Sequence, residues 1–375
     1  MSVSAAQFDV AVIGGGPAGA VTGLQAARSG LRVAVLDRRE PDGDRIGETI
    51  APSARAVLER LGLMAGFLAE GHLPSYANRS VWGRAALDER HFISDPYGHG
   101  WRLDRKRFDQ FLLAAAGDAG ALLQLRTSVK AFEPRAAGWQ LRLAGENGRE
   151  TEMSARWVVD ATGRPAWFAR RLGVARQVDD KLVGLAGFLG PSAQPFEDTT
   201  TLVEATADGW WYSALLPDTR LVAVYFTDAD LVEGNGGTRL AFWRKRLSDA
   251  RRTTARIERH QGALPSTVRV VGAGSACLET IAGSNWLAVG DAALSYDPLS
   301  SCGIVTAMAG GMEGAAAIRR RLSGDHGAAG RYAAHMRRSY ERYRSLLAAY
   351  YRDETRWADR PFWKRRSMDR AVTAA

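Results

Sequence analysis

"FDVAVIGGGPAGAVTGLQAARSGLRVAVLDR", residues 8–38, is the stretch that decides the fold. Within it, VAVI is typical of a short buried strand, and AGAVTGLQAARSG has helical apolar spacing with a glycine stop. RVAVLD is typical of a second strand that ends in an acid. The order strand, helix, strand predicts an α/β fold with Rossmann-like organisation.

The turn between the first strand and the helix carries glycines at Gly14, Gly16 and Gly19. The first permits a tight turn, the second lets the backbone approach a pyrophosphate, and the third lets the helix pack on the strand. The helix N-terminus then presents free N–H groups and its positive dipole end to the phosphates. Asp37, 18 residues after Gly19, can accept from ribose hydroxyls. The pattern predicts a dinucleotide site and leaves open whether NAD or FAD binds.

Composition narrows the class of protein. The 375 residues are 46% hydrophobic and 24% charged, which is ordinary for a globular protein, and the length predicts two domains or one composite domain. The net charge is +9, and basic, aromatic-rich runs lie at residues 336–344 and 362–370. Such runs are either a solvated helix face or a surface that attracts an acidic protein, an anionic membrane or nucleic acid. Because no nucleic-acid motif accompanies them, we expect no nucleic-acid partner.

The two cysteines, Cys277 and Cys302, form neither a disulfide framework nor a metal-ligand pattern. We therefore expect no metal and a reducing, cytoplasmic location. The apolar N-terminal stretch has no basic leader before it and no cleavage site after it. No window of about 18 consecutive apolar residues occurs, so we expect no membrane span.

Two later segments repeat the pattern of a strand running into a turn. WVVDATGRP, residues 157–165, runs into Asp160 and a glycine turn, and NWLAVGDAALSYDPLSSCGIVTAM, residues 285–308, reads strand, Gly-Asp, loop, glycine, helix. In the second, Asp291 ends a strand where a carboxylate could hold a ribitol hydroxyl, and a helix beginning at Gly303 would point N–H groups at an anion. A third segment, RLDRKRFDQFLLAAA, places Arg105 before an apolar helix.

The chain resembles the flavoprotein hydroxylases of the p-hydroxybenzoate-hydroxylase fold over residues 8–315. The resemblance rests on the combination and order of four motifs: GGGPAG, LDRKRFD, DATG and GDA…DP…GI. The resemblance implies FAD, with Asp37 on the adenosine ribose, Arg105 near the pyrophosphate or ribitol, and Asp291 on the ribitol. It also implies Gly303–Ile304 amides at the N1–O2 edge of the flavin, where they stabilise negative charge on the reduced ring. The expected cofactor-binding residues are Gly14, Gly16, Pro17, Ala18, Gly19, Asp37, Arg38, Arg45, Arg105, Val129, Asp160, Gly163, Asp291, Pro298, Gly303 and Ile304.

The resemblance also implies a domain division. We expect a discontinuous FAD-binding domain (1–74, 101–175 and 265–325), an antiparallel-sheet substrate domain (75–100 and 176–264) and a C-terminal helical region (326–375). The family motif near residue 160 is DG followed by Ser and Arg, whereas this chain reads DATGRP. That departure leaves open whether NAD(P)H or a separate reductase supplies electrons.

The segment IGETIAPSARAVLERLGL, residues 46–63, leads from a Gly-Glu pair through a proline into an amphipathic helix. In the fold that the chain resembles, this segment runs beside the isoalloxazine ring, so Glu48 is a candidate active-site carboxylate. The alternative is that Glu48 caps a helix or pairs with Arg45.

The middle of the chain is predicted to form antiparallel strands, among them GWWYSALLP at residues 209–217. Adjacent strand residues face opposite ways, so Trp210 and Tyr212 share a face. Together with Pro298 they are the expected substrate pocket, with ordinary core packing as the alternative.

The GE-x-x-x-P pattern is shared with flavin-dependent halogenases. Those enzymes need a lysine near the N-terminal helices and carry W-x-W-x-I-P, whereas this chain has no lysine before Lys106 and reads W-W-Y-S-A-L. The sequence therefore predicts that the chain is not a halogenase. It is more similar to the halogenase-like flavoproteins that modify a protein tryptophan in tryptophylquinone biogenesis, through the features already quoted and the tail YYRDETRWADRPFWKRR.

This resemblance implies an FAD-dependent monooxygenase that uses O2 and a flavin C4a-hydroperoxide to hydroxylate an electron-rich ring, here a tryptophan of a protein or peptide. The alternatives are a hydroxylase of a small aromatic metabolite, an isoprenoid-type FAD reductase, and a non-catalytic FAD-bearing maturation partner. The sequence singles out no acid or base. The candidates are Glu48, Tyr212, His72, His91, His99 and His260.

Cys302 lies immediately before Gly303, in the loop that the resemblance places beside the flavin. It is either a small side chain tolerated there, a reactive thiol, or a covalent link to flavin. A helix N-terminus would lower the pKa of its thiol.

Overall fold

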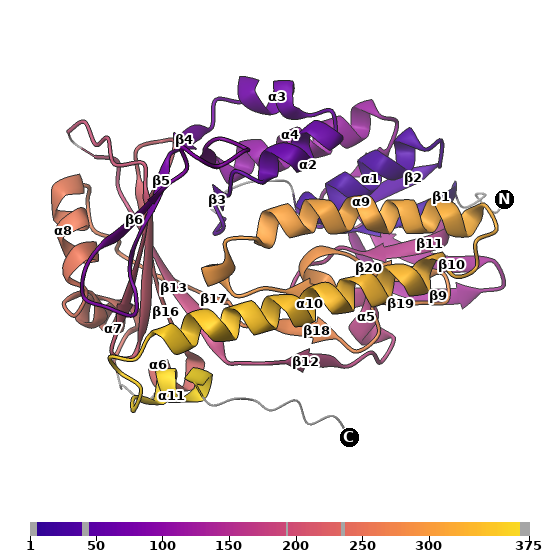
Figure 1. The fold of residues 1–375 in the computed structure, drawn as a ribbon. Coiled ribbons are helices and arrows are strands. Elements are labelled where there is room, and N and C mark those ends of the chain that lie inside the picture. The colour runs from indigo at the N-terminus through magenta and orange to yellow at the C-terminus, as the bar shows by residue number, and fades with distance from the viewer. Residues whose placement is uncertain (1–5, 40–44, 193, 234–236, 368–375) are drawn as a thin grey trace.

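The computed structural model describes residues 6–39, 45–192, 194–233 and 237–367. Two large β-sheets lie side by side, and helices pack on both of them (Figure 1). A small three-stranded sheet at the boundary consists of β3 (Thr49–Ile50), β7 (Gly100–Arg102) and β4 (Leu73–Ser75). The helices α2 (Ala54–Arg60) and α3 (Met64–Ala69) flank it.

The eight-stranded sheet is built on a buried parallel core in the order β20-β11-β1-β2-β8. Its apolar strands are buried because helices cover the sheet. Its strands are β1 (Ala6–Ile13), β2 (Val33–Leu36), β8 (Leu122–Gln124), β9 (Ser128–Arg135), β10 (Gly138–Ala144), β11 (Glu150–Asp160), β19 (Ala282–Gly283) and β20 (Trp286–Ala288). The helices α1 (Pro17–Arg28), α4 (Arg105–Asp118) and α9 (Gly303–Leu322) pack together beside it. This arrangement is the expected Rossmann-like α/β organisation.

The seven-stranded sheet has the order β17-β13-β16-β15-β14-β5-β6. It is antiparallel except that β5 and β14 run parallel. Its strands are β5 (Ala77–Val81), β6 (Asp88–His91), β13 (Leu182–Leu189), β14 (Thr201–Thr206), β15 (Gly209–Leu215), β16 (Leu221–Asp228) and β17 (Arg269–Gly272). The helices α7 (Arg239–Leu247) and α8 (Arg251–His260) cover one face.

The remaining elements connect these layers. They are α5 (Trp167–Arg171), α6 (Ala229–Glu233), the strands β12 (Arg176–Val178), β18 (Ala276–Leu278) and β21 (Leu294–Ser295), and the short 3-10 helices η1 (Gly290–Ala292) and η2 (Pro298–Ser300). The domain division expected from the sequence stays a prediction.

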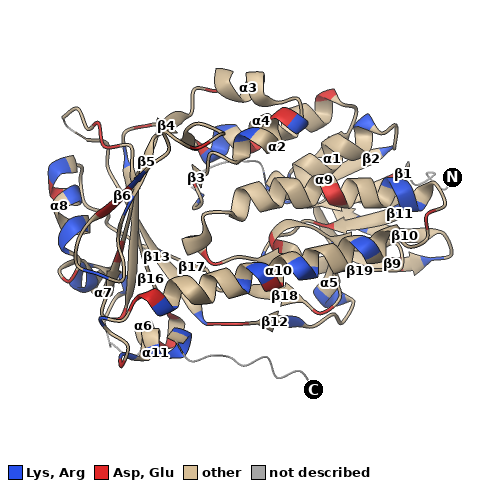
Figure 2. Cartoon of the chain, in the orientation of Figure 1, with Lys and Arg blue, Asp and Glu red and all other residues tan. Residues whose placement is uncertain are grey.

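The C-terminal helices α10 (Ala328–Asp353) and α11 (Pro361–Ser367) cross from the first sheet to the second (Figure 1). Their arginines and those of α7 and α8 are visible in Figure 2. Two arginines near the C-terminus pair with carboxylates at the ends of the second sheet: Arg360, just before α11, with Asp208, and Arg366 of α11 with Asp228. Much of the basic tail is therefore used within the chain.

Among the described residues, no helix is long and apolar enough to cross a membrane. The same part of the chain contains no cluster of three or more metal-ligating side chains.

The pairing of Asp228 yields a stability prediction. Its side chain is 2% exposed and accepts from Arg365 and from Arg366, whose own side chain is 8% exposed. Asp228→Asn should lower the free energy of unfolding by about 3 kcal/mol, because it leaves a buried guanidinium without its counter-charge. Urea denaturation measures this loss.

The matched control is Asp230→Asn, since Asp230 also binds Arg365 but is 39% exposed. An exposed pair of this kind contributes about 1 kcal/mol or less. Equal losses in the two variants would contradict the argument.

Candidate active site

The turn from β1 to α1 is a backbone cradle. Gly14 has φ of +111°, and a Cβ there would lie 2.2 Å from the carbonyl oxygen of Ala161. A Cβ on Gly19 would lie 1.8 Å from the carbonyl oxygen of Gly14. A Cβ on Gly16 would meet nothing within 4 Å, and no described side chain caps α1. The N–H groups at the start of α1, beside Pro17 and Ala18, therefore face open space and can bind an anion.

Asp37 closes this turn at the end of β2. Its Oδ2 accepts from the N–H of Gly15 at 2.7 Å, and its Oδ1 accepts from the N–H of Arg39 at 2.9 Å. Each carboxylate oxygen has a second lone pair, which remains for a ribose hydroxyl. Arg38, directly after Asp37, is exposed, and Val129 is half-buried on β9.

A second uncapped helix start lies at α9. The backbone turns through Ser301, with φ of +51°, into Cys302, and no described side chain caps the helix that begins at Gly303 and Ile304. A Cβ on Gly303 would meet nothing within 4 Å. A Cβ on Gly290 would lie 2.6 Å from the Cβ of Ala18, so this second segment packs directly against the first cradle.

Asp291 lies beside two arginines that come from elsewhere in the chain. The Nε of Arg164 lies 3.4 Å from its Oδ2, and Arg176 donates to its backbone oxygen. Desolvation raises the pKa of Asp291, and the positive charges of Arg164 and Arg176 oppose the rise. Arg164 belongs to the DATGRP segment, and the sequence analysis missed it.

Asp160 ends β11 and is fully buried. Its Oδ1 accepts from the N–H and hydroxyl of Thr162, and its Oδ2 accepts from the N–H of Ala169. Burial raises its pKa, and these hydrogen bonds oppose the rise. Its side chain therefore shapes the turn that contains Gly163, whose φ is +76°.

Arg45 and Arg105 meet on Asp109 of α4, which is fully buried. Arg105 also donates to the backbone oxygens of Ile46 and Gly47 at 2.9 and 3.0 Å, so it fixes the segment that leads to Glu48. The expected alternative pairing of Arg45 with Glu48 is wrong, because Arg45 binds Asp109 at 2.6 Å instead. Asp109 was not predicted as a site residue: Arg105 lies one turn before it on α4, but its second partner, Arg45, comes from a separate segment.

Glu48 is 2% exposed at the boundary between the two large sheets. Its Oε2 accepts from the N–H of Gly47 at 2.8 Å, and its Oε1 has no hydrogen-bond partner among the described residues. The hydroxyl of Tyr212 lies 2.6 Å from the Oγ1 of Thr49. Burial and the negative charge of Glu48 raise the pKa of Tyr212 well above its usual value.

Arg102 ties this cluster to the second sheet. It is fully buried and donates to the Oγ1 of Thr49 at 2.7 Å, to the Oγ1 of Thr201 at 2.7 Å and to the backbone oxygen of Thr199 at 3.1 Å. Burial lowers its pKa, and the charges of Tyr212 and Glu48 oppose this change. Its partners lie 53, 97 and 99 positions away in the chain, and no local pattern predicts these contacts.

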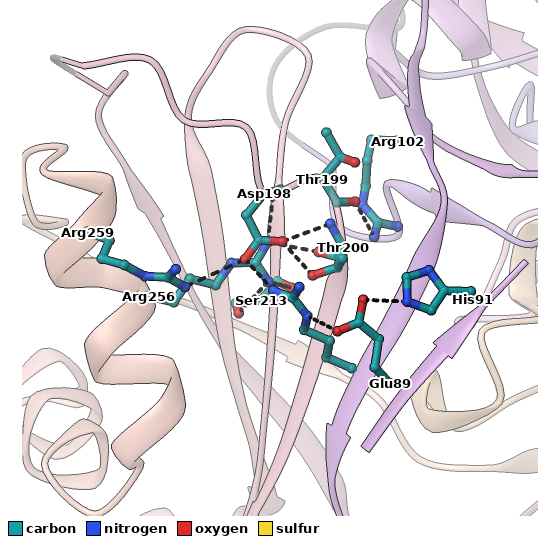
Figure 3. Close-up of polar contacts among 10 residues, drawn as sticks. Glu89, His91, Arg102, Asp198, Thr199, Thr200, Ser213, Arg256 and Arg259 are labelled. Atoms are coloured by element: carbon teal, nitrogen blue, oxygen red, sulfur yellow. Dashed lines mark hydrogen bonds and ion pairs between the residues drawn. The ribbon is translucent and has the colours of Figure 1, made fainter. Parts of the chain in front are cut away.

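A second buried arginine, Arg256 of α8, holds the same loop from the opposite side (Figure 3). It donates to the backbone oxygens of Asp198, Thr200 and Ser213, between 2.8 and 3.0 Å. Burial lowers its pKa to about 10, and Asp198 opposes that change. Figure 3 shows the loop held between Arg102 and Arg256.

Trp210 and Tyr212 lie on one face of β15, and Trp211 packs on the other. Trp210 is 1% exposed, stacks on Phe226 at 4.2 Å between ring centroids, and donates its indole N–H to Tyr351. It is thus packed by the C-terminal helices. Apolar side chains that are only partly buried on this face include Ile46, Phe188, Val203 and Leu299, and Pro298 is half-buried beside Leu299.

The histidines have partners of their own. Burial lowers the pKa of His72 to about 4, and its Nδ1 accepts from the N–H of Asp104. His91 pairs with Glu89, while His99 and His260 contact backbone oxygens. These contacts tie each ring to its local structure.

Cys302 is exposed, and its thiol donates to the backbone oxygen of Ser300 at 3.0 Å. The expectation of a lowered pKa is wrong: partial desolvation of the sulfur raises the pKa of this thiol.

Comparison with known proteins identifies the dinucleotide. The FAD-binding domain family matches residues 7–345. LodB of Marinomonas mediterranea, named as an FAD-dependent oxidoreductase, is 31% identical over 370 residues, which cover 98% of this chain and 99% of LodB.

Two solved structures are similar throughout. The peptidyl tryptophan dihydroxylase QhpG, described as essential for tryptophylquinone cofactor biogenesis, has a TM-score of 0.79 at 25% identity and covers 98% of this chain and 80% of its own. The flavin-dependent halogenase CmlS has a TM-score of 0.84 at 26% identity and covers 97% of this chain and 68% of its own. These likenesses confirm the fold class and FAD as the cofactor. The uncapped helix starts and the open space at Gly16 and Gly303 fit that cofactor.

The cradle yields a binding prediction. In Gly16→Ala the new methyl meets no protein atom within 4 Å, so the fold should be unaffected, but it intrudes where the pyrophosphate approaches. FAD affinity should fall by about tenfold or more, about 1.4 kcal/mol. Fluorescence of FAD released on dilution measures the affinity, and thermal unfolding of the apoprotein checks the fold.

Gly330→Ala is the control, since a Cβ there also meets nothing within 4 Å and Gly330 lies in α10. Unchanged FAD affinity in Gly16→Ala would contradict the assignment of the cradle.

Proposed function

The chain belongs to the FAD-binding domain family and is an FAD-dependent oxidoreductase, and from this premise we propose that it is a monooxygenase. Its substrate is an electron-rich aromatic ring, namely a tryptophan side chain of a protein or peptide during tryptophylquinone biogenesis. The observation that carries this proposal is the likeness to QhpG over 98% of the chain.

FAD supplies the redox chemistry by which O2 is activated. The start of α1 and the Gly14–Gly19 turn would bind the pyrophosphate, Asp37 the adenosine ribose, and Asp291 the ribitol. The amides at Gly303 and Ile304 would stabilise negative charge on the reduced flavin.

Other residues shape the reaction space. Arg105 holds the Ile46–Glu48 backbone through its bonds to Ile46 and Gly47, and this segment would lie beside the flavin. The apolar side chains Ile46, Leu299 and Phe188 pack against the same core cluster as Tyr212 and would limit water in a reaction space there. A planar, apolar side chain such as indole suits such a lining.

Glu48 is our candidate for the group that takes up the proton lost by the ring. Its Oε1 has no hydrogen-bond partner among the described residues, so it is the oxygen at which a proton can be held. Tyr212 and Thr49, which Arg102 supports, keep the carboxylate in place.

The electron source is NAD(P)H or a separate flavin reductase. Anaerobic mixing of the holoenzyme with NADPH decides between them, because only direct use bleaches the flavin without a second protein.

We propose a reducing, cytoplasmic location, since Cys277 and Cys302 are both free thiols.

Halogenation is the second candidate, and the likeness to CmlS favours it. Against it stand the absence of any lysine before Lys106 and the W-W-Y-S-A-L segment in place of W-x-W-x-I-P. Halide in the assay buffer distinguishes the two reactions by the mass of the product.

The proposal predicts that reduced holoenzyme, O2 and a tryptophan-containing peptide give a peptide heavier by one or two oxygen atoms. Mass spectrometry of the peptide measures this gain. Modification of free indole compounds alone would indicate a small-metabolite hydroxylase, and anaerobic saturation of a double bond an isoprenoid-type reductase. Peroxide release with no modified product would leave only a non-catalytic FAD-bearing partner and sink the proposal.

A second prediction concerns Glu48. Glu48→Gln keeps the shape but removes the proton acceptor, so kcat should fall by about a hundredfold, with FAD content unchanged. Steady-state oxygenation measures kcat. Glu59→Gln, at an exposed position on α2, is the control and should behave as the wild type. A wild-type kcat in Glu48→Gln would show that the ring proton leaves by another route.

A further inference from the structure

Three side chains from distant segments form one buried hydrogen-bonded chain. Trp210 on β15 donates its indole N–H to the hydroxyl of Tyr351 on α10 at 3.1 Å. That hydroxyl lies 2.7 Å from the Oδ2 of Asp297, in the loop that precedes α9. The three residues are 1%, 3% and 1% exposed, so water does not compete for these bonds.

When Asp297 is ionised, these hydrogen bonds can run in only one direction, from Trp210 through Tyr351 to Asp297. An indole N–H donates and cannot accept, so the oxygen of Tyr351 is the acceptor and its hydrogen is free for Asp297. The other carboxylate oxygen, Oδ1, accepts from the N–H of Leu299 at 2.8 Å. Asp297 therefore closes the first turn of η2 with one oxygen and anchors it to α10 with the other.

The loop that Asp297 anchors is the one that ends at the start of α9. Five residues separate Asp297 from Gly303, and the backbone between them is held by local bonds: Ser300 and Ser301 donate to the oxygens of Asp297 and Pro298. The N–H of Asp297 itself donates to the hydroxyl of Tyr343 at 2.6 Å, also on α10. Helix α10 therefore holds both the backbone and the side chain at the origin of this loop.

We propose that Tyr351 is a positioning residue for the flavin: through Asp297 it holds the 297–302 loop, so that the amides at the start of α9 face the isoalloxazine ring. The inference rests on the proposed placement of FAD and is independent of the substrate.

Asp297 gives this arrangement a dependence on pH. Burial raises the pKa of Asp297 to about 6, and the hydrogen bonds from Leu299 and Tyr351 oppose the rise. The charged groups that face it are Asp180, which raises this pKa, and Arg366, which lowers it. Tyr351 also lines a cavity of about 650 Å³ between α10, α11 and the Asp179–Lys181 segment, and its hydroxyl bonds to Asp297.

Protonation of Asp297 disrupts the hydrogen bonds that join Trp210, Tyr351 and Asp297. A protonated carboxyl donates to the oxygen of Tyr351, which then accepts twice while its own hydrogen loses its acceptor. Leaving a buried donor unpaired is costly. Because ionised Asp297 holds the loop, FAD binding is strong above the pKa of Asp297 and weakens as the pH falls through about 6.

The test measures FAD release from diluted holoenzyme by fluorescence between pH 5 and 8. In the wild type, the dissociation constant should rise as the pH falls through about 6. In Tyr351→Phe, it should be about tenfold higher at pH 7.5, because a hydrogen bond to a charged group is lost. The midpoint should move to higher pH, because that bond stabilises the ionised form.

Tyr340→Phe is the matched control. Tyr340 lies on the same helix, is 4% exposed and donates to the carboxylate of Asp179 at 3.0 Å, outside the loop. Its FAD affinity and pH midpoint should equal those of the wild type. Asp297→Asn should abolish the pH dependence near 6. An unchanged midpoint in Tyr351→Phe, or an equal shift in Tyr340→Phe, overturns the proposal.

If Tyr351→Phe does not fold, Trp210→Phe serves in its place. It removes the N–H that the oxygen of Tyr351 accepts and should move the midpoint in the same direction by a smaller amount, while no shift overturns the proposal. Failure to oxygenate any peptide, with these FAD results intact, would sink the proposed substrate and leave this inference standing.

Discussion

The close packing of α1 against its neighbours is the constraint on which the rest of the structure depends. A Cβ on Gly19 would lie 1.8 Å from the oxygen of Gly14, and one on Gly311 would lie 2.5 Å from the oxygen of Ala18. Only glycine permits backbone to meet backbone at these distances. The consequence is that α1 and α9 begin at the same edge of the first sheet, with both N-termini uncapped by the described side chains. In the proposed placement of FAD, the positive dipole ends of both helices would face the cofactor.

Local patterns predicted this part of the molecule because each of its requirements lies within a short segment. The strand, glycine turn and helix of residues 8–38 predicted the Rossmann-like fold and the dinucleotide, and the family resemblance carried by the later motifs implied FAD. The site partners Arg102 and Tyr351 could not be predicted in the same way. Arg102 bonds to Thr199 and Thr201, 97 and 99 positions away, and Tyr351 bonds to Asp297, 54 positions away. A contact of that kind depends on how the two sheets meet, and no periodicity in the sequence records it.

The composition shows a net positive charge, and the structure shows that several of the arginines responsible for it bind groups within the protein. A net charge of +9 permits an acidic partner, but several arginines are committed inside the chain. Arg102 and Arg256 hold one loop from two sides, and Arg366 holds α11 on Asp228. A guanidinium suits this task because its five donors form a fixed fork that can bind several backbone oxygens at once. The arginine content therefore describes how the layers are joined, and partner binding needs evidence of its own.

The second sheet shows why strand alternation predicts a face but not a function. Trp210 and Tyr212 do share a face of β15, yet their surroundings differ because α10 and α11 cover only one end of it. Trp210 is packed under these helices and bonds to Tyr351, whereas Tyr212 reaches across to Thr49 and Glu48. Trp210 of this strand thus contacts Tyr351, which holds the proposed flavin-positioning loop 297–302, and Tyr212 lies beside the candidate proton acceptor Glu48. A shift in the register of β15 would disturb both contacts at once, and the C-terminal helices oppose such a shift because Tyr351 and Trp363 bond to β15 and β14.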